Sequence, residues 1–600
     1  MADKLTPQQE MAVTSRGGKL LVSAAAGSGK TKVLVDRLLG FLTQEHDPAN
    51  LDEFLIITYT KAAASELRGK IAAKLTEEIA QRPEETHLQR QMQRLFLTKI
   101  STVHGFCSDL LREYAYKLDI AADFRVADEN ECREIRETVL EGLLDRAYET
   151  AGDDPDFRAL VDTQGVGRSD RQVPEIIEKV YDSAHCHLNP EAWLDKCLTD
   201  ADAEGIGDVG ETVWGQYLIR NLQEYLDCQI AVLRQCAESA DNCPGLEKPA
   251  VTLRDAMYQL EQLRACTIWD DIVAKRELRF GSLRFPTKDN PDPELTDRIK
   301  AAWSACKEGL KKKLSGFSND SGQVLTDLHQ TAAAQRGLVA LVRQFDRDYT
   351  AAKRSRRVLD FGDLEHKTLD LLLGKSRSQP TAAAREIGRR YREIMVDEYQ
   401  DSNGVQDAIF EALTREKQNC FMVGDVKQSI YQFRLADPGI FLEKYEKYVP
   451  AQQAEPGQGR KILLSHNFRS GAEVIDAVND VFHTCMRPKV GGLTYGEAEE
   501  LREGIPHVPL DDAVELHVIE TRDDQYPEEA AFVAEQIARM LREGTPVRDG
   551  DGLRPVRPED IVILLRSPGS GGGYFQKALE ARGIRCATGG GTDLLQTEEI

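Results

Sequence analysis

The sequence has no long apolar run, and this absence limits the kind of protein it encodes. No stretch of about 18 or more apolar residues occurs, which excludes a membrane-spanning helix. The first ten residues, MADKLTPQQE, lack the apolar core of a secretion signal. The 12 cysteines include no Cys-x-x-Cys pair and no metal-site spacing with histidine. We therefore expect reduced thiols and a cytoplasmic protein.

Positive charge is also in short supply. Lys and Arg number 77 against 100 Asp and Glu, so the net charge is −23. This balance argues against a protein that coats nucleic acid indiscriminately, although a local basic channel remains compatible with it. The basic run KRSRR, at 353–357, either meets duplex DNA or forms a solvated face. With 600 residues, of which 41% are hydrophobic, the chain should fold into several domains.

Residues 19–35, KLLVSAAAGSGKTKVLV, contain the first pattern that indicates chemistry. A predicted strand, a turn and a predicted helix follow one another there. The turn fits a phosphate loop, with Ala where the first Gly often stands. We predict that Lys30 reaches the β- and γ-phosphates of a nucleotide and that Thr31 binds Mg²⁺. The candidate nucleotide-binding residues are Ala24, Ala25, Ala26, Gly27, Ser28, Gly29, Lys30 and Thr31. A glycine-rich surface turn is the alternative.

The segment IMVDEYQDSN, residues 394–403, ends a predicted strand in carboxylates and an amide. Mg²⁺ prefers oxygen ligands, so we predict that Asp397 holds the metal through its water shell. Glu398 is predicted to orient and deprotonate the water that attacks the γ-phosphate. The alternative is a capped, acidic helix start, which is compatible with metal binding. Because 367 residues separate Lys30 from Asp397, either a domain is inserted between them or the pairing is false.

Four further segments place polar residues after a predicted strand. Ligands bind at this carboxyl edge in open α/β sheets, so several such strands indicate a shared site. The segments are FLIITYTKAAASELRGKI (54–71), KISTVHGFCSDL (99–110), QNCFMVGDVKQSIYQFRLADP (418–438) and KILLSHNFRS (461–470).

These segments occur in the order found in superfamily 1A helicases of the UvrD/Rep/PcrA type, which the sequence resembles. The matching motifs are LTPQQ, AAAGSGKT, TYTKAAASEL, VDEYQD, GDVKQSIYQFR and LLSHNFRS. ISTVHGFC and LDFGDLE resemble segments of the AddA and RecB group of helicase–nuclease subunits within that superfamily. The sequence departs from the usual motifs at Lys61, where Asn is common, and at Ser402, where Thr is commoner.

The resemblance implies roles for individual residues. Gln9 would hydrogen-bond adenine and Phe468 would stack on it, although Phe468 also fits an ordinary core aromatic. Gln428 would sense the γ-phosphate. Arg434 and Arg469 would neutralise charge on the phosphate, with surface ion pairs as the alternative. Tyr59, Tyr431 and Phe433 would stack on unpaired bases, and Thr58, Thr60, Thr102 and His104 would contact DNA phosphates. A structural role is as good an expectation for His104.

The implied fold is an α/β phosphate-loop NTPase with RecA-like parallel sheets flanked by helices and a large, mainly helical insertion. The first motor domain would comprise 1–110 and 355–455, the insertion 111–354, and the start of the second motor domain 456–600. In that last part, VELHVIE and DIVILLR are predicted strands, EEAAFVAEQIARML and FQKALEARGI are predicted helices, and SPGSGGG is a predicted loop.

The resemblance implies an ATP- and Mg²⁺-dependent 3′→5′ DNA helicase that processes double-strand breaks. Its partners would be single-stranded DNA, duplex ends and an AddB-like protein that forms a heterodimer with it. In the family a further inserted domain begins near TEEI, and later motifs and a nuclease domain follow it. We therefore expect residues 1–600 alone to bind ATP weakly and to unwind nothing.

Three alternatives stay open. One is a stand-alone UvrD/PcrA-type repair helicase without a nuclease. The second is a DNA-tethering protein without turnover, against which the intact Lys30, Asp397, Glu398 and Arg469 argue. The third is an ABC- or SMC-type ATPase, which should carry an LSGGQ-like stretch that this sequence lacks.

Overall fold

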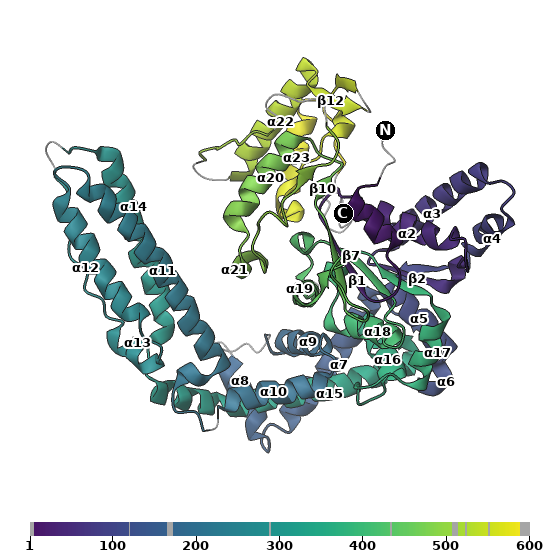
Figure 1. Ribbon diagram of the computed structural model, residues 1–600. Coiled ribbons are helices and arrows are strands. Elements are labelled where there is room, and N and C mark those ends of the chain that lie inside the picture. The colour runs from purple at the N-terminus through teal and green to yellow at the C-terminus, as the bar shows by residue number, and fades with distance from the viewer. Residues whose placement is uncertain are drawn as a thin grey trace. The chain divides into compact units, whose positions relative to one another are not determined.

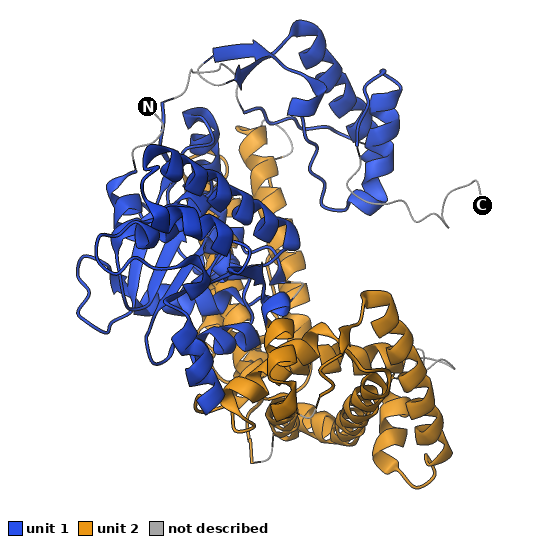
Figure 2. Ribbon diagram, turned by 90° about the vertical axis from the view of Figure 1, so that its right-hand side faces the viewer, with its two compact units in different colours: residues 1–106, 382–600 blue, residues 107–381 orange. Residues whose placement is uncertain are grey.

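Two compact units make up the chain in the computed structural model, which describes residues 5–118, 120–164, 172–203, 205–286, 290–432, 435–506, 514–521, 525–549 and 552–587. The first unit comprises residues 1–106 and 382–600, and the second comprises 107–381 (Figure 2). These limits differ from the predicted insertion at 111–354. The first boundary falls inside helix α5 (Val103–Glu113), and helix α16 (Phe361–Leu373) belongs to the second unit.

The first unit is built on a seven-stranded parallel sheet, as predicted. Its strand order is β3-β2-β6-β7-β1-β9-β8, and all neighbouring pairs are parallel. Strand β1 is central: Leu20 lies opposite Phe421 of β7 on one side and Arg460 of β9 on the other. The strands are β1 (Leu20–Ala24), β2 (Phe54–Thr58), β3 (Lys99–Thr102), β6 (Glu393–Val396), β7 (Cys420–Gly424), β8 (Val449–Pro450) and β9 (Arg460–Leu464).

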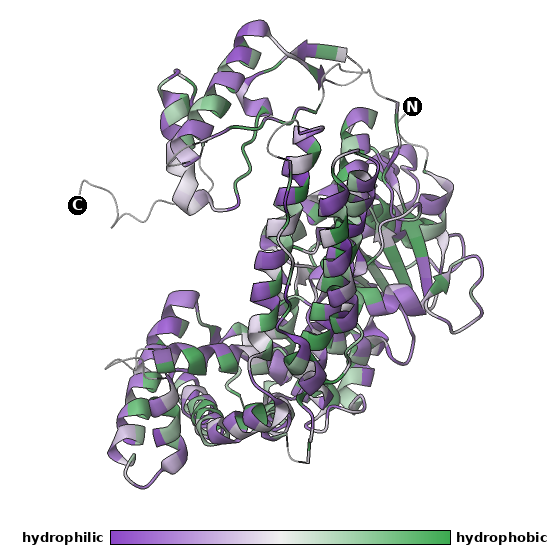
Figure 3. Ribbon diagram, turned by 90° about the vertical axis from the view of Figure 1, so that its left-hand side faces the viewer, coloured by the Kyte–Doolittle hydropathy of each residue, from purple (hydrophilic) through white to green (hydrophobic). Residues whose placement is uncertain are grey.

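Continuous apolar sequence explains why these strands lie inside the unit. Strands such as FLIIT and CFMVG are buried at every position, which is typical of a parallel sheet covered on both faces. One face packs against Val33, Leu34 and Leu38 of helix α2 (Lys30–Leu42). The sheet strands carry the green of apolar residues in Figure 3.

Helices follow most of the strands in the first unit (Figure 1). They are α1 (Pro7–Thr14), α2, α3 (Lys61–Gln81), α4 (Thr86–Arg94), α17 (Ala382–Arg390), α18 (Gly404–Thr414), α19 (Pro438–Lys447), α20 (Ala472–Cys485), α21 (Pro488–Gly491), α22 (Gln525–Glu543) and α23 (Pro568–Glu580). Short 3₁₀ turns include η1 (Leu51–Glu53), η4 (Tyr399–Asp401), η5 (Val426–Gln428) and η7 (Pro558–Asp560). Two small strand pairs complete the unit: β10 (His466–Asn467) with β11 (Arg502–Glu503), and β12 (Pro546–Asp549) with β13 (Gly552–Pro555).

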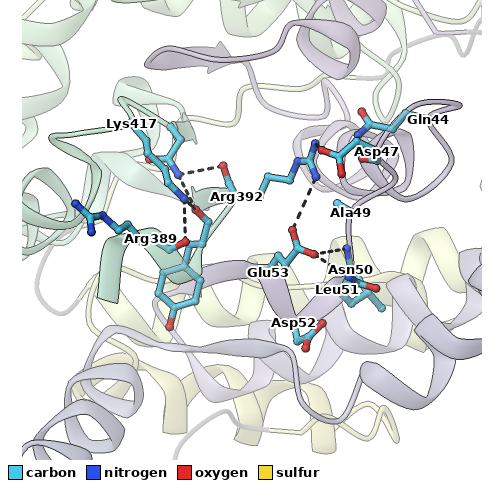
Figure 4. Close-up of polar contacts among 12 residues, drawn as sticks. Gln44, Asp47, Ala49, Asn50, Leu51, Asp52, Glu53, Arg389, Arg392 and Lys417 are labelled. Carbon is cyan, nitrogen blue, oxygen red and sulfur yellow. Dashed lines mark hydrogen bonds and ion pairs between the residues drawn. The ribbon is translucent and has the colours of Figure 1, made fainter. Parts of the chain in front are cut away.

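A buried ion pair ties helix α2 to the start of β6. The Arg37 guanidinium donates to both carboxylate oxygens of Glu393, over 2.7 and 2.5 Å, and to the Ala12 carbonyl over 2.7 Å. The two side chains are 1% and 3% exposed. The next residue, Arg392, reaches Asp47 at 2.7 Å (Figure 4). These contacts lie at the amino-terminal edge of the sheet, away from the phosphate loop.

The second unit is mainly helical, as predicted. One core gathers α11, α12 and α14 around Trp269 and Trp303, and another gathers α7, α8, α9 and α15 around Phe345. The elements are α6 (Ala115–Leu118), β4 (Arg125–Val126), α7 (Glu129–Glu149), α8 (Pro155–Gln164), α9 (Gln172–His185), α10 (Pro190–Asp202), η2 (Val209–Glu211), α11 (Val213–Asp241), α12 (Glu247–Arg264), α13 (Trp269–Lys275), α14 (Pro293–Leu314), η3 (Ser315–Phe317), α15 (Ser321–Arg356), β5 (Val358–Leu359) and α16.

The basic run KRSRR is only partly a surface feature. Lys353 is 2% exposed, and its ammonium lies 2.7 Å from carboxylate oxygens of both Asp360 and Asp363. Those two carboxylates belong to the LDFGDLE segment. A buried ammonium needs such partners, because an unpaired charge in the interior is costly. Lys353 is therefore not available to duplex DNA as the run suggested.

Several predictions for the last part of the chain are wrong. Residues 460–464, assigned to a second motor domain beginning at 456, form β9 of the first sheet. VELHVIE and DIVILLR are not strands in the described residues, and Leu516 and Leu564 are 90% and 85% exposed. An apolar alternation makes a strand only where a neighbouring strand pairs with it. SPGSGGG begins helix α23, since Pro568 suits a first helical position. Helix α22 confirms EEAAFVAEQIARML.

The described residues contain no helix of the length and apolar character that crossing a membrane would require.

Candidate nucleotide-binding site

The phosphate loop joins the end of β1 to the start of α2. Gly27 and Gly29 have φ angles of +68° and +82°, which favour glycine. A Cβ atom on Gly27 would lie 2.7 Å from the Asn467 side chain. The loop thus needs glycine at this position for both conformation and space. Lys30 and Thr31 open α2, so the positive end of the helix faces the loop.

Gln9 contacts the phosphate loop directly. Its side-chain amide donates to the Ser28 carbonyl over 2.9 Å, and the residue is 4% exposed. Its side-chain oxygen accepts from the Thr6 backbone N–H, while the Thr6 hydroxyl accepts from the Gln9 N–H, over 2.9 and 3.1 Å. This capping box fixes the first turn of α1. The sequence therefore brings Gln9 to the loop, as predicted.

Lys30 meets the acidic segment that follows β6. Its ammonium lies 2.8 Å from the Glu398 carboxylate and 3.5 Å from the Gln428 side-chain oxygen. Glu398 has φ +50°, a left-handed conformation that is uncommon outside glycine. Strained backbone of this kind persists where the surrounding structure holds it, often at functional sites. The inserted-domain explanation for the long separation is confirmed.

The acidic residues here are not comfortable as free anions. Burial raises the pKa of Asp397 to about 6, and the neighbouring Glu398 charge adds to this. Burial also raises the pKa of Asp401 to about 6, again with Glu398 contributing. One Asp401 carboxylate oxygen is buried without a hydrogen-bond partner. The site thus has more acceptor oxygens than donors.

This donor and acceptor balance fits magnesium bound together with a nucleotide. Hard oxygen ligands are present in the Asp397 carboxylate and the Thr31 hydroxyl, as Mg²⁺ prefers. In the described residues no three His, Cys, Asp or Glu side chains are arranged to hold a metal by themselves. Phosphate oxygens and water would therefore supply the remaining ligands.

A second polar loop joins the site from the end of β7. Asp425 is 1% exposed; its carboxylate accepts from the Gln428 side-chain amide over 2.7 Å and from the Lys427 ammonium over 2.8 Å. Its backbone N–H donates to the Gln400 side-chain oxygen over 2.9 Å. Sequence reasoning missed Gln400, Asp401, Asp425 and Lys427. All four stand inside the VDEYQD and GDVKQ motifs, which was the available signal.

The predicted threonine contacts to DNA follow β2 and β3, at the same edge of the sheet. Thr58 donates to the Thr60 carbonyl over 3.2 Å. The Thr60 and Thr102 hydroxyls accept backbone N–H groups of the helices that follow them, over 3.0 and 3.1 Å. These hydroxyls thus have local capping roles, and phosphate contact stays a prediction.

The predicted aromatic and histidine contacts are less constrained. The Tyr59 hydroxyl bonds the Ser402 hydroxyl, next to the acidic segment. Tyr431 is 37% exposed, and His104 lies half-buried at the start of α5. The structure places these side chains near one edge of the sheet, and base or phosphate contact remains a prediction for each.

The segment after β9 also reaches the phosphate loop. The Phe468 backbone N–H donates to the Gly27 carbonyl over 2.9 Å. The Asn467 side-chain oxygen accepts from the Arg469 N–H over 2.7 Å, which fixes the backbone at Arg469. Phe433 and Arg434 lie outside the described residues.

A phosphate loop after the central strand, with an acidic pair and a sensor amide from neighbouring strands, defines a P-loop nucleoside-triphosphate-binding core. Residues 5–449 match the family described as UvrD/REP helicase N-terminal domain, and the chain belongs to that family.

Curated relatives add detail, and those compared here are all named as the A subunit of an ATP-dependent helicase/nuclease. The chain is 34% identical to the protein of that name from Pelotomaculum thermopropionicum, over 100% of the chain and 51% of that protein. Its counterparts from Geobacillus thermodenitrificans and Listeria welshimeri are 35% and 33% identical, over 99% of the chain and 50% of each. The chain therefore spans about half the length of the curated relatives it matches.

Proposed function

We propose that this chain supplies the nucleotide-binding part of an AddA-type protein, an ATP-dependent 3′→5′ DNA helicase that works with a nuclease at double-strand breaks. The observation that carries the proposal is the convergence of Lys30, Glu398 and Gln428 within 3.5 Å, from three separate strand ends. That arrangement matches what hydrolysis of a γ-phosphate needs: a phosphate-binding cation, a base and a sensor. The names of the relatives support the helicase and nuclease assignment.

Hydrolysis would follow from the positions of these side chains. Lys30 and the loop N–H groups would bind the phosphates, and Gln9 and Phe468 would hold adenine. Glu398 would take a proton from the attacking water as that water bonds to the γ-phosphorus and ADP leaves. Asp397 and Thr31 would hold Mg²⁺, which supplies charge neutralisation at the phosphates. Arg434 and Arg469 would neutralise charge on the transferred group.

DNA would bind at the edge formed by the β2, β3 and β7 loops. Aromatic stacking tolerates any base, as a motor requires, and contributes about 1–3 kcal/mol per base. The aromatic candidates are Tyr59, Tyr431 and Phe433, and the phosphate-contact candidates are Thr58, Thr60, Thr102 and His104. We further propose single-stranded DNA and duplex ends as substrates, an AddB-like protein as partner, and a cytoplasmic location. The two motor domains and the helical insertion keep the proposed roles of the UvrD type.

The test is ATP hydrolysis by the full-length protein with and without single-stranded DNA, beside a Glu398→Gln variant. We expect DNA to stimulate the parent and the variant to lose at least about a hundredfold in kcat, since general-base catalysis contributes about 10²–10⁴-fold. DNA-independent turnover of equal rate in both proteins would overturn the motor proposal. Nuclease activity of the full-length protein separates the AddA type from a stand-alone UvrD-type helicase.

A further inference from the structure

We infer that Gln400 is a positioning residue that couples the proposed base, Glu398, to the loop that carries the γ-phosphate sensor and Tyr431. This inference rests on the proposed function and deepens it. Gln400 lies in the η4 turn and is 2% exposed, so its amide works inside the protein rather than in water. Both ends of that amide are used, and they bind two different functional segments.

The nitrogen end of the amide binds the base. Gln400 Nε2 donates to Glu398 Oε2 over 3.0 Å, and the same carboxylate oxygen accepts from Lys30 Nζ over 2.8 Å. The Glu398 side chain is 41% exposed, so packing alone does not hold it. Two donors fix the direction in which its carboxylate points.

The oxygen end of the amide binds the loop after β7. Gln400 Oε1 accepts from the Asp425 backbone N–H over 2.9 Å. A Cβ atom on Gly424 would lie 2.3 Å from that oxygen, so glycine is what lets the loop approach so closely. The Ser429 hydroxyl also donates to the Gln400 carbonyl over 3.4 Å. The loop therefore bonds to the side chain and the backbone of one residue.

The contacts close into a ring. Asp425 accepts from the Gln428 side-chain amide over 2.7 Å, and the Gln428 side-chain oxygen lies 3.5 Å from the Lys30 ammonium. A triphosphate that takes up the Lys30 ammonium opens this ring at Lys30. Gln400 then remains as a donor to the Glu398 carboxylate. Any shift of the loop that follows DNA binding moves Asp425, and through Gln400 it changes the position of the base.

Two substitutions in the full-length protein separate the two contacts. Gln400→Glu keeps the shape and the oxygen that accepts from Asp425, but it replaces the donor to Glu398 by a carboxylate. Gln400→Met removes both contacts. We expect Gln400→Glu to lower kcat at least about tenfold with KM for ATP within about threefold, because general-base positioning acts on the chemical step. Basal and DNA-stimulated rates should fall in the same proportion. For Gln400→Met we expect, in addition, a loss of at least about threefold in the ratio of DNA-stimulated to basal rate.

Gln91 offers a matched control in the same unit. It is 0% exposed, its side-chain oxygen accepts from the Leu51 N–H over 2.9 Å, and its amide donates to Asn50 over 3.1 Å, at the other edge of the sheet. Gln91→Glu and Gln91→Met carry the same chemical change and should keep kcat and DNA stimulation within about twofold of the parent. The melting temperature of each variant shows how far stability is affected.

The outcomes are distinct. Gln400→Glu with kcat within about twofold of the parent overturns the coupling role, as does an equal loss of kcat in the Gln91 variants. If Gln400→Met does not fold, the near-isosteric Gln400→Glu decides. A parent that shows no DNA-stimulated hydrolysis, or a Glu398→Gln variant that hydrolyses normally, overturns the proposed function itself and this inference with it.

Discussion

The Lys30 ammonium and the Glu398 carboxylate form an ion pair 2.8 Å long although 368 positions separate them in the chain. The sheet makes this contact possible, because only β7 lies between β1 and β6. The helical unit leaves the first unit near residue 106 and returns near 382, so it lengthens a connection without parting the strands. The pairing of an early phosphate loop with a late acidic segment therefore depends on strand order.

Lys30→Met should weaken nucleotide binding by about tenfold to a hundredfold, because a hydrogen bond to a charged group contributes about 1.5–3 kcal/mol. The measurement is the dissociation constant of a fluorescent ATP analogue. Lys19→Met is the matched control, since Lys19 also pairs with a glutamate, Glu411, at the opposite end of β1. Equal affinity of the two variants would contradict the assignment of Lys30 to the phosphates.

Gly27→Ala should damage nucleotide binding beyond its conformational cost. Both Gly27 and Gly17 have φ angles near +65°, at +68° and +65°, so alanine should cost each about 1–2 kcal/mol of stability. Only at Gly27 does the new Cβ meet a side chain, that of Asn467 at 2.7 Å, whereas Gly17 has nothing within 4 Å. We expect a similar loss of melting temperature in both variants, but weaker ATP-analogue binding only in Gly27→Ala.

Arg37→Met should lower the free energy of unfolding by about 3–5 kcal/mol, because it leaves the Glu393 carboxylate buried without its cation. Urea denaturation measures the change. The exposed pair of Arg94 and Asp52, 2.7 Å apart, is the comparison, and Arg94→Met should cost less than about 1 kcal/mol. Replacing both Arg37 and Glu393 by Met should recover part of the loss. Equal costs for Arg37→Met and Arg94→Met would show that burial does not set the strength of the pair.

The second unit should lose stability as pH falls below about 6.5, the usual pKa of a free histidine. Burial lowers the pKa of His366, and the facing Arg377 and His185 also contribute, against an opposing pull from Glu365. The folded state therefore favours neutral His366, while the unfolded chain takes up the proton, so acid favours unfolding. Neutral His366 fits its contacts: it donates to the His185 carbonyl over 2.8 Å and accepts from Arg377 over 2.9 Å.

Melting temperatures between about pH 5 and 7.5 test this dependence. His366→Gln should make the decline with falling pH shallower. His329→Gln, at an exposed position of the same unit, should leave it unchanged. An identical slope in the parent and in His366→Gln would show that another group is responsible.

Local patterns explain what the sequence could predict. The phosphate loop is a contiguous run whose glycines and helix start are readable directly, and the buried strands are continuous apolar stretches. The pairing of Lys30 with the acidic segment followed from chemistry, since each half was incomplete alone. The contact of Gln400 with Asp425 was out of reach, because it depends on the side-by-side packing of β6 and β7, which no local pattern encodes.

Charge patterns were a weaker guide. Lys353 stands in a basic run, and only the fold shows that Asp360 and Asp363 enclose it. The alternating apolar residues of 514–520 and 561–566 predict strands, yet strand formation requires a neighbouring edge that the sequence does not reveal. Domain boundaries were displaced for a similar reason: β9 follows a linker-like stretch but pairs with β1.

The central position of β1 has a consequence for synthesis on the ribosome. Its two neighbours, β7 and β9, end at residues 424 and 464, so the second edge of β1 stays without a partner until 440 further residues have followed Ala24. At translation rates of about 5–20 residues per second, that wait lasts roughly 20–90 s. Throughout it, the apolar LLVSA strand and its helix α2 are free to misassociate. A trigger for chaperone engagement during translation is thus built into the strand order, and it ends when β9 docks.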